Sequence, residues 1–241
     1  MKSLKHTIQL LLLLTLIAEI PFQSTAQRRR SYRSSQSNAT YSYGATAGFN
    51  ISSLAPENGS NSNNMLGFFG GGFFEYRFTE KIGGQINVNF IQLGGEKIPT
   101  TLLFSPNSIF LYDVKSIDLS IYGIDVPLTA KYHFTEFSPE FYVNLGLSGT
   151  YILKAQAALN KETSVGGMYS SNTTYVDVTK KVQNLQACGV VGCGTSIPLG
   201  NLSILLDITF HYGITDLSAN NIAANNGFNS KFLKVGVGVV F

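Results

Sequence analysis

A period-two alternation of side chains, recurring through most of the chain after residue 40, is the feature that most constrains the fold. Bulky apolar residues occupy one parity, and small or polar residues occupy the other. At the end of the chain, for example, valine alternates with glycine. Such alternation indicates β-strands with two chemically different faces. It predicts eight strands, at 41–51, 66–78, 82–92, 116–134, 138–153, 182–197, 201–214 and 231–241.

The lengths of the connections predict how these strands are arranged. Tight turns at 79–81, 135–137 and 198–200 alternate with long polar loops at 52–65, 93–115, 155–181 and 215–229. An even number of strands, with all long loops at one end and both termini at the other, is typical of outer-membrane barrels. We therefore predict an all-β fold, an eight-stranded antiparallel up-and-down transmembrane β-barrel over 41–241. Because the apolar parity shifts within 116–134, we also predict a β-bulge near Gly123.

Composition indicates which face of the sheet meets lipid. Charged residues make up only 13% of the chain, against about 25% in soluble domains. The polar parity is mostly Gly, Ser, Thr and Asn, which suits a narrow interior better than a water-facing coat. A soluble lipocalin-like barrel, with the apolar parity lining its cavity, is the alternative. Aromatic residues near strand ends favour the membrane barrel, since they are expected in two interfacial girdles: Tyr41, Phe78, Phe134, Tyr151, Tyr212 and Phe241.

The N-terminal residues are expected to direct secretion. Lys2 and Lys5 precede an apolar run at 8–18, and small residues up to Ala26 suit a signal peptidase, so we predict a signal peptide at 1–26. Residues 27–40 are expected to form a flexible basic tail. The tail carries the excess positive charge: residues 34–241 hold 11 basic and 13 acidic groups, a net of −2. No interleaving of basic and aromatic residues follows, so nucleic-acid binding is not expected.

Several segments resemble one known family. The run Tyr122-Gly-Ile-Asp-Val-Pro-Leu-Thr-Ala-Lys-Tyr-His-Phe134 is similar to a strand of PorT-like outer-membrane β-barrel proteins, as are 141–149, 211–217 and the terminal Val-Gly-Val-Gly-Val-Val-Phe241. The resemblance covers about 40–241. It implies location in the cell outer membrane, with outer-membrane lipids as neighbours. It also implies insertion by the barrel-assembly machinery, which would read the last strand and Phe241, and, for some relatives, a part in protein secretion.

The inward parity carries the residues that could form a functional site. Three acids and three bases are expected there, with His133 and His211 beside them. Unpaired buried charges are unfavourable, so equal numbers predict a paired network. The network is interpreted as a plug, with a proton relay or a gate as alternatives. Its six predicted members are Glu75, Arg77, Asp125, Lys131, Asp207 and Lys234.

Catalytic, metal and cofactor sites have little support in the sequence. His211 lies near Asp207, Thr215 and Asp216, but no Gly-x-Ser-x-Gly motif occurs. Cys188 and Cys193 should lie on opposite faces of one strand, too far apart for a disulfide. We expect no cofactor, no metal and no enzyme activity. The predicted function is a structural or interaction component of the cell envelope, with a possible protein partner at the long extracellular loops. A small channel or a lipid-modifying enzyme is the alternative.

Overall fold

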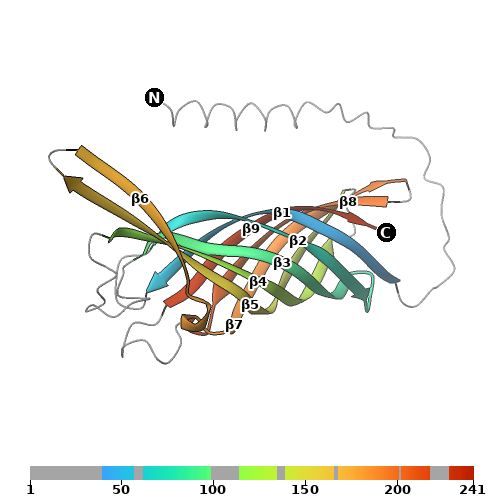
Figure 1. The fold of residues 1–241 in the computed structure, drawn as a ribbon. Helices are drawn as coiled ribbons and strands as arrows, with labels where there is room; N and C mark the ends of the chain where they lie inside the picture. Colours follow the sequence, from blue (N-terminus) through green and yellow to red (C-terminus); the bar gives the residue numbers. More distant parts are fainter. Residues whose placement is uncertain are drawn as a thin grey trace. The chain divides into compact units, whose positions relative to one another are not determined.

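The computed structural model describes residues 40–56, 62–98, 114–134, 139–165, 168–200, 202–217 and 228–241. These residues are almost entirely β-strand (Figure 1). One turn of 3-10 helix, η3 (Thr179–Lys181), follows β6. The described residues form no helix that is both long and apolar enough to cross a membrane. The strands are β1 (Thr40–Pro56), β2 (Asn63–Arg77), β3 (Ile82–Ile98), β4 (Val114–Phe134), β5 (Glu140–Val165), β6 (Met168–Asp177), β7 (Leu185–Leu199), β8 (Leu202–Gly213) and β9 (Phe228–Val240).

Eight of these strands close into a barrel. The sheet order is β4-β3-β2-β1-β9-β8-β7-β5-β6, and a further pairing between β4 and β5 completes the ring. Every pairing is antiparallel, so the predicted fold class is confirmed. Six of the eight barrel strands are longer than predicted, and β1 and β2 extend into the segment 52–65 that was predicted as a loop.

The strand β6 was not predicted. The segment 155–181 was predicted as a polar loop, but β5 continues to Val165 and pairs with β6 from Gln156↔Asp177 to Val165↔Met168. The two strands form a hairpin, called here the arm, that leaves the barrel wall (Figure 1). Between residues 160 and 177, Ser, Thr, Asn and charged residues make up 11 of the 18 positions and occur on both parities. A strand with two polar faces lacks the apolar alternation on which the prediction depended, which is why it was missed.

The predicted bulge exists, but the reason given for it was wrong. The β4–β5 register shifts between Tyr122↔Lys154 and Gly123↔Ile152, so Leu153 of β5 is the extra residue. The strand β4 itself alternates without interruption, and its odd-numbered residues from Ile117 to His133 all face inward and are buried. The same face of β4 points inward along its whole length. The apolar residues change parity because the barrel interior is polar at one level and apolar at the next.

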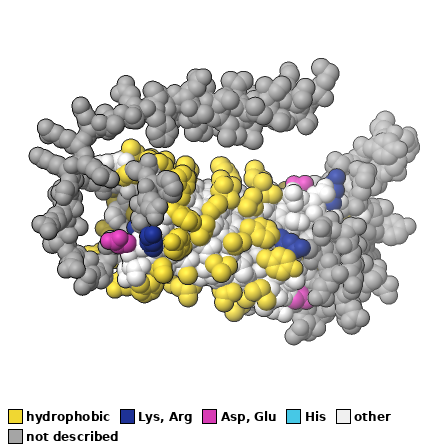
Figure 2. Space-filling model, turned by 180° about the vertical axis from the view of Figure 1, so that it is seen from behind, with side chains coloured by type: hydrophobic (Ala, Val, Ile, Leu, Met, Phe, Trp, Pro, Cys, Tyr) yellow, Lys and Arg dark blue, Asp and Glu magenta, His cyan; other side chains and the backbone are white. Residues whose placement is uncertain are grey.

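A belt of bulky apolar side chains covers the outside of the barrel (Figure 2). Leu128, Leu145 and Phe49 are 63%, 67% and 66% exposed. On β4 the belt runs from Phe134 to Ile124, about 33 Å along the strand or roughly 25 Å along the barrel axis at a tilt near 40°. Such a band matches the hydrocarbon core of an outer membrane. This lipid belt excludes the soluble-barrel alternative, since a soluble protein would bury these side chains.

Above the lipid belt, the interior and the exterior exchange character. The outward residues of β4 become polar at Ser120 and Asp118, while Ile117, Leu119 and Ile121 point inward and are at most 1% exposed. We call the resulting cluster the upper core. This part of the barrel is built like a water-soluble protein. The enclosed face is mostly polar only at the level of the lipid belt, where Phe73, Tyr142 and Leu205 form a smaller apolar cluster. The upper core also contains Leu54, Phe69, Ile91, Leu93, Ile98, Ile152, Ala155, Ala157, Leu159, Val178, Val182, Cys188, Leu217, Phe228 and Phe232.

Two further predictions can be compared with the fold. Cys188 is buried, Cys193 is exposed, and both are free thiols, as expected for opposite faces of one strand. The signal peptide at 1–26 and nearly all of the tail at 27–40 lie outside the described residues, so they stay predictions.

Candidate functional site in the barrel interior

The first of two groups of charged side chains inside the barrel lies at the end with the short turns. Glu75 and Arg77 lie two residues apart on β2, and Lys131 and His133 lie two apart on β4, so each pair shares the inward face. Glu140, the first residue of β5, completes this group. We call these five residues the basal cluster.

Close contacts connect the basal cluster across three strands. The Glu75 carboxylate lies 3.0 Å from Lys131 Nζ, 2.9 Å from His133 Nε2 and 3.1 Å from Arg77 Nε. Glu140 Oε1 lies 2.7 Å from His133 Nδ1 and 3.1 Å from Arg77 Nη1. Each carboxylate therefore faces more than one cationic or imidazole group, so the charges compensate one another at this end of the barrel.

A second group, the central cluster, surrounds Asp125, which is fully buried. The hydroxyls of Ser148 and Thr150 donate hydrogen bonds to Asp125 Oδ1, the latter over 3.0 Å. Lys234 Nζ lies 3.4 Å from Asp125 Oδ2. The long strand pairings place β4, β5 and β9 around the same lumen, which brings residues 109 positions apart into contact. In the middle of the barrel, the charge of Asp125 is thus balanced by Lys234, and two hydroxyls donate hydrogen bonds to its carboxylate.

Aromatic rings cover both buried lysines. Lys131 Nζ lies 4.0 Å from the centre of the Tyr142 ring, and Lys234 Nζ lies 4.5 Å from that of Phe69. At such distances the ring face attracts the cation. The rings require small neighbours: a Cβ on Gly194 would lie 2.2 Å from the Tyr142 hydroxyl oxygen. The glycines on inward positions therefore make room for the aromatic residues that hold the lysines.

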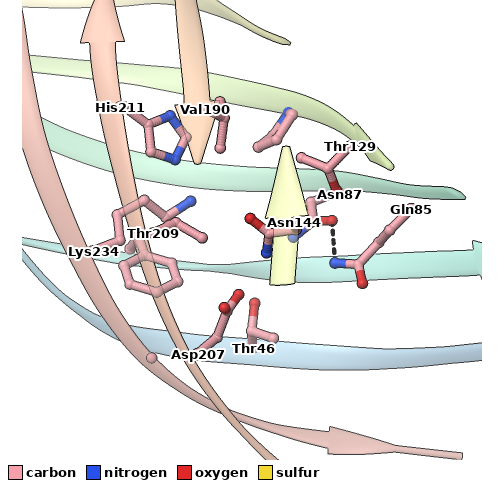
Figure 3. A pocket seen from close by; sticks show the side chains of 13 residues that line it. Thr46, Gln85, Asn87, Thr129, Asn144, Val190, Asp207, Thr209, His211 and Lys234 are labelled. Atoms are coloured by element: carbon pink, nitrogen blue, oxygen red, sulfur yellow. Dashed lines mark hydrogen bonds between the residues drawn. The ribbon is translucent and has the colours of Figure 1, made fainter. Parts of the chain in front are cut away.

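A small cavity of about 20 Å³ lies between the two clusters. Asp207, Asn144 and His211 line it, and Figure 3 shows their side chains converging with those of Lys234 and Thr209. Space of this size admits about one water molecule. Asn144 Oδ1, Asp207 Oδ1 and both ring nitrogens of His211 are buried without a protein hydrogen-bond partner, and a water molecule there would reach polar neighbours.

The structure therefore divides the six predicted lumenal residues. Glu75, Arg77 and Lys131 lie in the basal cluster, and Asp125 and Lys234 lie in the central cluster. Asp207 lines the cavity between them. Glu140 was not predicted, although it has the inward parity of Tyr142 and Asn144 and could have been found from that parity. The upper core was not predicted. To predict it, one would have to know which face of each strand points inward beyond the bulge.

The residues considered for catalysis have structural roles. His211 is 1% exposed and stacks on Phe232 at a centroid distance of 4.3 Å. Thr215 Oγ1 accepts a hydrogen bond from Ala187 N over 2.9 Å, and Asp216 Oδ1 accepts one from Phe228 N over 2.8 Å. Thr215 and Asp216 thus hold the starts of β7 and β9, and His211 packs against the upper core. Within the described part of the chain, no three His, Cys, Asp or Glu side chains are grouped so as to hold a metal ion.

Phe241 lies at the foot of the lipid belt. Its backbone N–H donates to Tyr43 O over 2.8 Å, and its exposed ring lies 5.9 Å from that of Tyr43. The last residue is therefore tied to the first strand, where the barrel closes. Its recognition by the assembly machinery stays a prediction.

The chain is similar in structure to solved proteins from several bacteria. OprG from Pseudomonas aeruginosa is 13% identical, covers 85% of this chain and 97% of its own, and has a TM-score of 0.45. Neisserial surface protein A is 18% identical, with 84% and 97% covered and a TM-score of 0.43. Ail of Yersinia pestis, solved in complex with the heparin analogue sucrose octasulfate, is 16% identical, with 83% and 99% covered and a TM-score of 0.42. No curated protein matches the chain.

A family model agrees with the structure on where this barrel resides. The model described as "Outer membrane protein beta-barrel domain" matches residues 25–219, which is most of the chain. The closed ring of eight strands and the lipid belt are the physical features that such a location requires. The chain is thus a protein of the cell outer membrane, and it belongs to the outer-membrane β-barrel domain family.

Proposed function

We propose that the protein is a closed, non-enzymatic barrel that anchors an interaction surface in the outer membrane. One observation carries the proposal: the described lumen is filled along its length, while β5 and β6 extend beyond the lipid belt. A filled lumen offers no passage, and a structured projection offers a surface to another molecule of the cell envelope.

The filling of the lumen argues against a channel. The basal and central clusters occupy the level of the lipid belt, and the upper core closes the lumen above it. An ion crossing this region would leave water for an apolar interior, which is strongly unfavourable. Eight-stranded barrels generally have interiors that their own side chains fill. We therefore assign the lumenal side chains to stabilising the barrel, and the proposed function to its surface.

The proposed partner is another protein of the envelope, and a link to secretion is part of the proposal. The support for secretion is the resemblance of 122–134 and the terminal strand to PorT-like proteins. The arm supplies a surface for such a partner, since it is polar and outside the lipid belt. Outer-membrane lipids and the barrel-assembly machinery are the other proposed partners.

Two measurements test the proposal. The purified barrel in planar lipid bilayers should give no stepwise ion conductance, with an open porin as the positive control. Crosslinking in intact outer membranes should join the protein to a protein partner, identified by mass spectrometry, and deletion of the gene should alter secretion. Regular conductance steps, or hydrolysis of outer-membrane lipids by the pure barrel, would contradict the proposal.

A further inference from the structure

The arm presents the free strand edge of this sheet. Among the described strands, all except β6 have partners on both sides, because β4 pairs with β5 and closes the ring. The strand β6 pairs with β5 alone, over ten residue pairs without a register shift. Alternate residues of a strand direct their N–H and C=O groups to opposite edges, so about half of the backbone groups of β6 point away from β5.

This edge lacks the features that normally prevent pairing. Exposed edges in soluble proteins are usually protected by Lys, Pro, a bulge or a very short strand. The strand β6, with sequence MYSSNTTYVD, is ten residues long and contains no Lys, Arg or Pro. Its only charged residue is Asp177, at its end. Tyr, Thr and Val, which favour strands, make up half of it.

The base of the arm is held in place, so the edge is formed before any partner arrives. Val178 and Val182 are buried in the upper core, and Val178 N donates to Ala155 O over 3.0 Å. Asp177 Oδ1 accepts hydrogen bonds from the Thr179 hydroxyl and N–H over 2.7 and 2.9 Å. These bonds hold the pKa of the Asp177 carboxyl below its ordinary value, so the carboxylate is charged at neutral pH. Little ordering would be needed when a partner binds.

We propose that β6 binds an extended, uncharged segment of another polypeptide, which adds to the sheet as a further antiparallel strand. The backbone groups of the free edge would supply affinity, and Tyr175, which is 68% exposed, would pack against a side chain of the added strand. The near absence of charge on β6 favours an uncharged segment, because a charged one would gain no ion pair from it. This inference rests on the proposed function and names the surface through which it acts.

A second copy of this chain does not fit the edge. Two copies in one membrane share an orientation, so the only dyad available to them runs along the membrane normal. Antiparallel pairing of two β6 strands would need a dyad perpendicular to the strand, and parallel pairing would need one along it. The strand β6 follows β5, a barrel strand tilted by roughly 40°, and lies oblique to the barrel axis (Figure 1).

Synthetic peptides test the edge directly. The probe is a capped, fluorescent heptapeptide of alternating Thr and Val with a central Tyr, and its control carries N-methyl groups on alternate residues. The full barrel in nanodiscs should bind the first peptide saturably and the second at least tenfold more weakly, because N-methylation removes the donors of one edge. Equal binding of both peptides, or of neither, would overturn the proposal.

Two neighbouring proline variants locate the binding edge. Thr173→Pro and Thr174→Pro remove adjacent N–H groups, which point to opposite edges of β6. Amide hydrogen exchange on the arm identifies the variant in which the β5–β6 pairing survives. That variant should lose peptide binding by at least tenfold, and retained binding would overturn strand addition. If envelope crosslinking still captures the same partner with this variant, the proposed function stands and this inference fails.

Discussion

Asp125 shows how closely the buried charges depend on single neighbours. It has two hydroxyl donors and one cation, Lys234, whereas Glu75 faces Lys131, His133 and Arg77 together. Losing one partner of a buried pair leaves a charge uncompensated, and the cost rises when no other cation is near. The central cluster should therefore be the more sensitive of the two.

Lys234→Met is expected to destabilise the barrel by about 3 kcal/mol, because Asp125 would keep no cation. Lys131→Met should have a smaller effect, since His133 and Arg77 still face Glu75. Because the chain has no tryptophan, urea unfolding in lipid vesicles is followed by far-UV CD, which gives the stability loss of each variant. The double variant Lys234→Met with Asp125→Asn is the control and should regain most of the loss. Equal stabilities of single and double variants would contradict the pairing.

Gly194 is expected to tolerate no larger side chain. A Cβ there would meet the Tyr142 hydroxyl oxygen at 2.2 Å, and the ring is buried with Lys131 against it. Gly194→Val should cost about 1–3 kcal/mol through overpacking. Gly189→Val, where a Cβ meets only the tip of Ile214 at 3.9 Å, is the matched control on the same strand. Thermal unfolding in detergent would compare them, and equal melting temperatures would contradict the contact.

Among the elements, β5 carries out two tasks in succession. Its first part pairs with β4 and β7 as a barrel strand. Its last ten residues pair with β6, and of these only 156–161 also lie along the part of β4 that pairs with β5. The extra residue Leu153 lies where the change begins, so that Leu153 and Lys154 both point outward and Ile152 and Ala155 both point inward. The bulge thus allows the upper part of β5 to contribute alanines to the upper core.

Deleting Leu153 should remove the bulge and leave the fold intact. Leu153 and Lys154 both point outward, so without Leu153 the strand alternates regularly, with Ile152 inward, Lys154 outward and Ala155 inward. The heat-modifiable band of the folded barrel on cold SDS gels should therefore be retained. Deleting Ala157, where β5 already alternates, should instead turn the buried Leu159 outward and abolish the band. Loss of the band on deletion of Leu153 would contradict its assignment as the extra residue.

On the scale of the whole molecule, the exterior divides into a lipid belt and a wet upper part. The boundary crosses β5 at the bulge. On the membrane side of the bulge the exposed residues of β5 are apolar, such as Leu147 at 64% exposure, whereas Lys154, just beyond Leu153, is exposed and charged. The apolar belt and the apolar upper core occupy different levels of one barrel. A single tube of strands is therefore a membrane protein below the boundary and a water-exposed protein above it.

Cysteine labelling can map that boundary. In liposomes, a charged maleimide should modify Lys154→Cys rapidly, because this outward position is in water. Leu147→Cys, which also faces outward on β5, should react at least tenfold more slowly within the hydrocarbon. Native Cys193, exposed in the lipid belt, is an internal control and should also be protected. Rapid labelling of Leu147→Cys in intact liposomes would place the boundary elsewhere.

The sequence by itself determined the barrel strands and their two faces. Period two is a local property: Leu128 and Thr129 face opposite sides whatever their partners are, so the lipid belt, the inward charges and the eight barrel strands could be predicted. Only the tertiary structure decided which inward residues meet. Contacts such as Lys131–Glu75 and Lys234–Asp125 join residues 56 and 109 positions apart, and they depend on strand register and barrel closure. The upper core belongs to the same class, because the burial of Ile117, Leu119 and Ile121 depends on the strands that surround them. The strand β6 was found only in the structure, because polar residues lie on both of its faces and leave no apolar alternation.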